Sequence, residues 1–142
     1  MRRGQWLLVA FVVLLFSMSA WGAFTEATVS GKVIVTDTVT GLIWTKEYSG
    51  TVIWQNALAY CENLSYAGYT DWRLPNIDEL KTLIDDTIYS PASTFPGMLS
   101  EYFWSSSSHA HYTTPAWRVD FSYGYVNYSS KANTYCARCV RQ

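Results

Sequence analysis

Cys136 and Cys139 have the most recognisable chemical spacing in the chain, because they form a C-x-x-C motif. Such pairs serve redox chemistry or bind zinc. Here the segment Thr134–Arg141 has the pattern of a last strand, on which residues three apart point to opposite faces. The sequence has no second cysteine pair, so a four-thiolate zinc site cannot be completed. We interpret the motif as structural, and three cysteines in total suggest one disulfide and one remaining thiol.

Two histidines and a run of serines form the second group that could do chemistry. His109 and His111 flank one alanine directly after Ser105–Ser108. A metal site needs more ligands in a fixed geometry, so we interpret the histidines as exposed loop residues. If they contact a ligand, that contact should depend on pH at about 6–7. The serines have no general base at a defined spacing, so no catalytic residue, metal or cofactor is predicted.

The C-terminal part of the chain has a composition suited to ligand binding. The segments 116–121 and 125–128 have the pattern of strands joined by a tight turn, and they are rich in Tyr, Ser and Asn. Antibody paratopes combine rigid rings with small hydrogen-bonding groups in the same way, and aromatic faces also stack on sugar rings. The alternative, that these are ordinary tyrosines of an edge strand, remains open. The predicted ligand-binding residues are Arg118, Asp120, Tyr123, Tyr125, Asn127, Tyr128, His111 and Tyr112.

The alternation along these strands predicts which way the side chains point. Val119 and Trp117 are expected on one face of the first strand, and Arg118 and Asp120 on the other. In the second strand, Val126 is expected to point inward. The tryptophans predicted to lie in the core are Trp44, Trp54, Trp72, Trp104 and Trp117.

A helix start at Asn76 is the strongest local signal among the elements that must support this surface. Pro75 disfavours a helical conformation for the residue before it, and Asn76 is a preferred N-cap. Glu79 stands three residues later and completes a capping box. The spacing of the apolar residues that follow predicts a helix from Asn76 to about Asp85. Asp78 and Glu79 are neighbours on this helix and do not face each other, so they are not an acid–base pair.

The remaining elements give the order hairpin, helix, helix, irregular region and C-terminal meander, which is an α+β pattern. The predicted hairpin consists of Lys32–Thr36 and Leu42–Trp44, after a polar lead-in at Phe24–Ser30. A helix is predicted over Trp54–Leu64, with Thr51 as its cap and Cys61 on its inner face. The segment Thr87–Ser100 is expected to be irregular, and Glu101–Ser108 to begin as a strand that runs into the serines.

The N-terminus has the features of a signal peptide. Arg2 and Arg3 precede an apolar run at Trp6–Phe16 that is short for a membrane span of about 20 residues, and small residues follow it. We therefore predict a signal peptide at 1–22 and one domain at 23–142, with no membrane span after cleavage; an uncleaved anchor is the alternative. The protein should be secreted or periplasmic. Without the two arginines, eight basic residues face eleven acidic ones, which argues against nucleic-acid binding.

Several short motifs in a fixed order carry a resemblance to a known family. They are T-G-L-I-W at 40–44, A-Y-C at 59–61, D-W-R-L-P at 71–75, E-L at 79–80, F-W-S-S-S at 103–107, A-W-R-V at 116–119 and R-C-V-R at 138–141. This series resembles the Lcl C-terminal domain family, a bacterial domain of unknown function. That family is grouped with C-type-lectin-like folds, as are the formylglycine-generating enzymes and the variable proteins of diversity-generating retroelements.

The resemblance implies a C-type-lectin-like fold and an exported binding module for glycans, glycosaminoglycans or protein surfaces. It also implies a disulfide between Cys61 and Cys139 that joins the first helix to the last strand. Because residues three apart on a strand point to opposite faces, Cys136 is then expected to be an outward thiol, free or paired between chains. Calcium-dependent lectins of this fold use an acidic-Pro-Asn loop and a Trp-Asn-Asp motif. Neither is present in this sequence, so no calcium is predicted.

Three functional hypotheses follow. The first is a non-catalytic module that binds a glycan or protein through the C-terminal meander and the loop His109–Thr114. The second is an enzyme similar to the formylglycine-generating enzymes, which would need a metal-binding or redox cysteine pair on one face. The third is a structural unit that forms homo-oligomers through its aromatic surface or through Cys136.

Overall fold

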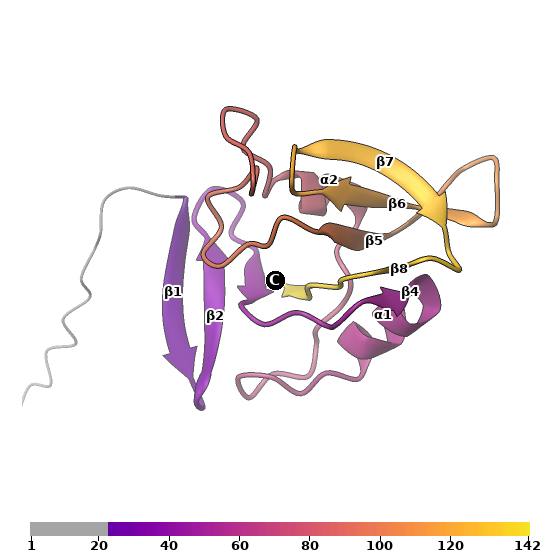
Figure 1. The fold of residues 1–142 in the computed structure, drawn as a ribbon. Coiled ribbons are helices and arrows are strands. Elements are labelled where there is room, and N and C mark those ends of the chain that lie inside the picture. Colours follow the sequence, from indigo (N-terminus) through magenta and orange to yellow (C-terminus); the bar gives the residue numbers. More distant parts are fainter. Residues whose placement is uncertain (1–22) are drawn as a thin grey trace, which may run out of the picture.

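The first sheet joins segments from both ends of the domain. The computed structural model describes residues 23–142, so the predicted signal peptide lies outside the described residues. Strands β1 (Phe24–Val29), β2 (Lys32–Asp37), β3 (Ile43–Thr45) and β9 (Val140–Arg141) form an antiparallel sheet in the order β1-β2-β3-β9. Figure 1 shows β1 and β2 at the left, with the chain end close to the centre.

The predicted hairpin is confirmed, but the polar lead-in before it is wrong. Ile34 lies opposite Thr45 in the pairing of β2 with β3. The supposed lead-in is strand β1, which pairs with β2 from Phe24 to Val29. Most of its side chains are exposed on both faces, so it has no apolar alternation. It is held by backbone hydrogen bonds to β2, which sequence patterns do not reveal.

Helix α1 (Trp54–Glu62) follows the short strand β4 (Val52–Ile53), which pairs with β8 (Thr134–Tyr135). The N-cap residue is Ile53, without a side-chain hydrogen bond, so the predicted cap at Thr51 is wrong. The pairing of β4 with β8 fixes the entry of the chain into the helix instead. The Trp54 N–H donates to the carbonyl of Lys131, just before β8.

Helix α2 (Ile77–Lys81) has the predicted capping box but ends earlier than predicted. The Thr82 hydroxyl donates to the Glu79 carbonyl at 2.7 Å, and the next two N–H groups bond three residues back rather than four. This tightened turn ends the helix before Asp85. Leu83 is nevertheless buried, so the apolar spacing identified core residues correctly although the last turn is not α-helical.

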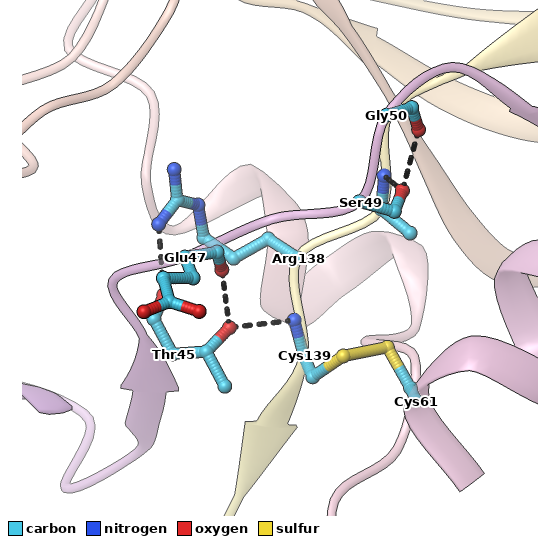
Figure 2. The surroundings of a disulfide bond; sticks show 8 residues. Thr45, Glu47, Ser49, Gly50, Cys61, Arg138 and Cys139 are labelled. Carbon is cyan, nitrogen blue, oxygen red and sulfur yellow. Dashed lines mark hydrogen bonds between the residues drawn. A yellow bond between two sulfur atoms is a disulfide. The ribbon is translucent and has the colours of Figure 1, made fainter. Parts of the chain in front are cut away.

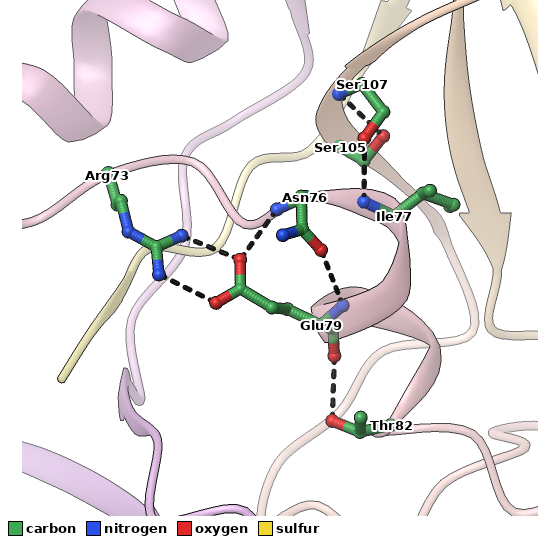
Figure 3. A network of polar contacts seen from close by, with 7 residues as sticks. All are labelled: Arg73, Asn76, Ile77, Glu79, Thr82, Ser105 and Ser107. Carbon is green, nitrogen blue, oxygen red and sulfur yellow. Dashed lines mark hydrogen bonds and ion pairs between the residues drawn. The ribbon is translucent and has the colours of Figure 1, made fainter.

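The capping box extends into a polar network that ties α2 to the neighbouring strand (Figure 3). Arg73 donates two hydrogen bonds of 2.7 Å to the Glu79 carboxylate. The Ser107 hydroxyl accepts from the Ile77 N–H at 3.0 Å, and the Ser105 hydroxyl donates to the Trp117 carbonyl at 2.7 Å. The serine run therefore connects α2 and two strands of the meander.

The C-terminal meander is confirmed as a three-stranded antiparallel sheet in the order β5-β6-β7. Its strands are β5 (Tyr102–Ser108), β6 (Pro115–Asp120) and β7 (Tyr125–Ser130). Strand β7 forms the edge, and Figure 1 shows it at the top of the molecule. Val126 is 38 % exposed there, so its predicted inward position is wrong. The irregular region before β5 is also confirmed, since residues 87–100 hold no helix or strand.

The predicted single last strand is interrupted between β8 and β9. At this interruption Arg138 is buried, and its guanidinium donates to the carbonyls of Thr45 and Lys46. Cys136 is buried in the core, so its predicted outward position is wrong. Burial raises the pKa of its thiol.

The predicted disulfide between Cys61 and Cys139 is confirmed (Figure 2). It links α1 to the residue before β9, and the two Cα atoms are 5.4 Å apart. Around it lies one of two buried clusters, which includes Trp72 and Trp104. The other cluster joins α2, the meander and the first sheet, and it includes Leu80, Phe103 and Trp44. The fold class is therefore α+β, with two helices packed on short antiparallel sheets.

Candidate ligand-binding surface

A group of exposed and half-buried aromatic rings lies at one end of the meander. We call it the aromatic face, and its members are His109, His111, Tyr112, Trp117 and Tyr128. The His109 ring is stacked on Trp117 at 5.6 Å with an interplanar angle of 20°, and it lies 5.1 Å from Tyr112. Tyr128 contacts His109 edge-on at 4.7 Å and Trp117 at 5.4 Å. Tyr112 and Tyr128 are 62 % and 46 % exposed.

The strands and the loop between them hold this face in place. Trp117 lies opposite Tyr128 in the register of β6 with β7, so the two rings share one side of the sheet. The loop 109–114 folds back because the His109 N–H donates to the Pro115 carbonyl at 3.1 Å. Lys131 closes the loop from the other side, with its ammonium 2.7 Å from the Thr113 carbonyl. The rings are therefore arranged before any ligand binds.

A second exposed group lies at the opposite end of β7. We call it the tyrosine groove, and it is lined by Asp86, Ile88, Tyr89, Tyr123 and Tyr125. The hollow has a volume of about 330 Å³. The rings of Tyr123 and Tyr125 are stacked with centroids 6.0 Å apart and an interplanar angle of 29°. Residues three apart on a strand point to opposite faces, so the Tyr125 ring and the Tyr128 ring lie on different sides of the sheet.

Three predicted ligand-binding residues lie in neither group. Asp120 is only 6 % exposed and accepts a hydrogen bond from the Ser122 N–H at 2.8 Å, so its predicted surface position is wrong. It stabilises the turn after β6 instead. The guanidinium carbon of Arg118 lies 4.0 Å above the Tyr102 ring, which makes this side chain part of the packing beneath the sheet. Asn127 accepts from the Tyr128 N–H at 2.8 Å.

The sequence interpretation missed two members of the aromatic face. Trp117 was predicted to be core, yet it is only partly buried, as is Trp54. His109 lies in the loop that the first hypothesis assigns to ligand binding, but it is not among the predicted site residues, although its ring joins Tyr112, Trp117 and Tyr128. The position of Trp117 near the start of a strand, followed by an edge strand rich in tyrosine, was the available signal. The folding of the loop over Trp117 has no signature in the sequence.

Two features are absent from the part of the chain that the structure describes: a cluster of metal ligands and a membrane-spanning helix. Within residues 23–142, no group of three or more His, Cys, Asp or Glu side chains is placed to hold a metal ion. In the same part of the chain, no helix has the length and apolar character needed to cross a membrane. What the aromatic face offers is a set of ring faces with phenol and imidazole hydrogen-bonding groups at their edges.

Together these features define a small α+β domain that exposes aromatic rings on a C-terminal meander. The family model of the Lcl C-terminal domain matches residues 33–141. Because this match covers most of the chain, the protein belongs to the Lcl C-terminal domain family. No curated protein matches the chain.

Proposed function

We propose that this protein is an exported, non-catalytic binding module that recognises a glycan through the aromatic face. The observation that carries the proposal is the preformed arrangement of the exposed rings of Tyr112 and Tyr128 around the half-buried rings of His109 and Trp117. A protein surface is the second ligand class that the same residues would suit, since Tyr and Trp provide large contact areas at low entropic cost.

The chemistry of the rings favours a sugar. A pyranose ring presents a face of C–H groups that can pack on an aromatic ring, while its hydroxyls need hydrogen-bond partners nearby. The phenols of Tyr112 and Tyr128 and the imidazole of His111 provide such partners at the rim. Rings already held by one another lose little conformational freedom on binding, which lowers the entropic cost of association.

The cysteines support a non-catalytic, exported module. A formylglycine-generating-like activity would need a free cysteine pair, but Cys139 is bonded to Cys61 and Cys136 is buried. Burial of Cys136 also argues against an oligomer joined through that thiol. Disulfides form in exported proteins, which agrees with a signal peptide at residues 1–22 and a binding domain at 23–142.

The arrangement of the elements supports a C-type-lectin-like assignment within this proposal. Two helices pack on short sheets, and the first and last parts of the domain are paired in one sheet. In the variable proteins of retroelements, which the sequence resembles, the tail corresponding to this meander carries the variable ligand surface. A similar use of the meander is proposed here.

A glycan array with purified protein tests the proposal, followed by affinity measurements on any glycan that binds. The double variant Tyr112→Ala/Tyr128→Ala should weaken binding at least about tenfold, because each lost stacking contact costs roughly 1 kcal/mol. Val39→Ala is the matched control, since Val39 is also an exposed apolar residue but lies between β2 and β3. Unchanged affinity of the double variant would show that the aromatic face is not the site.

A further inference from the structure

The tyrosine groove differs from the aromatic face in its charge. Its lining combines three tyrosine rings with one carboxylate, that of Asp86, and contains no basic side chain. Among residues 23–142, no ion pair involves Asp86. Tyr89, Tyr123 and Tyr125 are 76 %, 60 % and 67 % exposed, so each presents a ring surface to a ligand, although Tyr123 and Tyr125 turn one face toward each other.

The two walls of the groove are tied together below the rings. The turn that carries Tyr123 is fixed to the loop before Ala92, because the Ala92 N–H donates to the Phe121 carbonyl at 2.7 Å and the Ser90 N–H donates to the Ser122 carbonyl at 2.8 Å. Gly124 lets the turn approach closely, since a Cβ at this position would lie 3.0 Å from a methyl carbon of Ile84. The groove is therefore part of the folded framework.

We propose that the tyrosine groove binds a quaternary ammonium group of the choline type. The faces of aromatic rings carry negative electrostatic potential and attract cations, and the Asp86 carboxylate adds a formal negative charge. A quaternary ammonium ion is weakly hydrated, so it loses little when it leaves water, whereas a primary ammonium ion is strongly hydrated. Ile88 provides an apolar contact for the methyl groups.

The tyrosine groove is a shallow hollow of about 330 Å³ that is largely open to solvent, so a small cation can reach it directly. The site lies at the turn between β6 and β7, away from the aromatic face at the other end of β7. The proposal of a choline-type ligand at this site therefore does not depend on the proposed glycan binding at the aromatic face.

The test uses the full chain with choline as the probe, measured by calorimetry or by NMR shifts of the tyrosine ring protons. Choline should bind saturably, and its neutral isostere 3,3-dimethylbutan-1-ol should bind at least about tenfold more weakly because it lacks the charge. Asp86→Asn and Tyr125→Ala should each weaken choline binding about fivefold. Phosphocholine is the second probe: equal binding assigns the ligand to a phosphocholine headgroup, and binding of choline alone assigns it to the free cation.

Equal binding of choline and the neutral isostere would overturn the proposal, because the groove would then be merely apolar. Absence of choline binding, or full affinity in both Asp86→Asn and Tyr125→Ala, would overturn it as well. Asp86 is exposed, and Asp86→Asn keeps the size of the side chain. The variant should therefore fold like the wild type, and a change in choline affinity reports the loss of the charge. Tyr128→Ala should leave choline binding unchanged, which separates this site from the aromatic face.

Discussion

Arg138 is the residue whose environment is most unusual. Its side chain is about 1 % exposed and has no carboxylate partner among residues 23–142. Burial lowers its pKa to about 10, which still leaves the guanidinium charged at neutral pH. Only Nη1 is hydrogen-bonded, to the carbonyls of Thr45 and Lys46, whereas Nε and Nη2 have no hydrogen-bond partner among the described residues. The faces of nearby rings surround the guanidinium, of which Phe95 is the closest at 4.5 Å. Cation–π contacts of this kind gain strength away from water.

Replacing Arg138 with alanine should destabilise the fold by about 3 kcal/mol. The substitution leaves two inward carbonyls without their donor and opens a cavity beside Phe95 and Phe103. Chemical denaturation measures this change in the free energy of unfolding. Lys81→Ala is the control, because Lys81 is an exposed cation and should have little effect. A loss below about 1 kcal/mol for Arg138→Ala would contradict the structural role.

At the scale of elements, α2 illustrates how a short helix can be fixed by polar contacts at its start. A helix of five residues would not be stable in isolation. Its capping box and the Arg73–Glu79 ion pair stabilise it within the fold. The hydrogen bonds from Arg73, together with the Asn76 N–H, lower the pKa of Glu79 in the folded protein. The folded state therefore binds this proton less tightly than the unfolded chain does.

This shift predicts an acid-sensitive contribution to stability. Because the folded pKa of Glu79 is depressed, its contribution is present above the unfolded pKa, about 4.3, and is lost as the pH falls through the folded pKa. Glu79→Gln retains the capping geometry but not the charge, so it should remove about 0.5–1 kcal/mol at neutral pH, a low value because Arg73 is 42 % exposed and screened by solvent.

Denaturant unfolding between pH 3 and pH 7 checks the prediction, and the difference between wild type and Glu79→Gln should shrink as the pH falls. Asp78→Asn serves as the comparison, because Asp78 is highly exposed in its pair with Lys81. A difference that does not change with pH would mean that the charge of Glu79 is not responsible.

Local signals predicted some elements well and others poorly. The capping box at Asn76 and the hairpin after Lys32 depend on neighbouring residues, and both are confirmed. Strand β1 and the break in the last strand depend on partners far away in the sequence, so the local pattern could not reveal them. The same reason applies to Trp117, which the alternation predicts to lie in the core. The loop that brings His109 onto its ring is held by a backbone hydrogen bond to Pro115 and by the Lys131 side chain.

At the scale of the whole molecule, the disulfide is the main covalent constraint. It joins cysteines separated by 78 positions, across the boundary between α1 and the sheet that contains β9. In the entropic model, a closed loop of this length contributes roughly 4–5 kcal/mol by restricting the unfolded chain. That amount is comparable to much of the net stability of a small domain.

Removing the disulfide should therefore lower the free energy of unfolding by several kcal/mol. The double variant Cys61→Ala/Cys139→Ala, measured by denaturant unfolding, is expected to lose roughly 4–5 kcal/mol or to be unfolded at neutral pH. Cys136→Ala is the control for loss of a cysteine, and as a small change in the core it should cost much less. Equal effects of the two changes would contradict the role assigned to the disulfide.

The pairing of β3 with β9 has a consequence for how the protein is made. Trp44 in β3 lies opposite Val140 in β9, so most of the domain must be synthesised before this sheet can be completed. Contacts between such distant segments slow folding. During translation β3 therefore remains without its β9 partner until the end of the domain has been made. The topology thus couples completion of the first sheet to completion of the chain's synthesis.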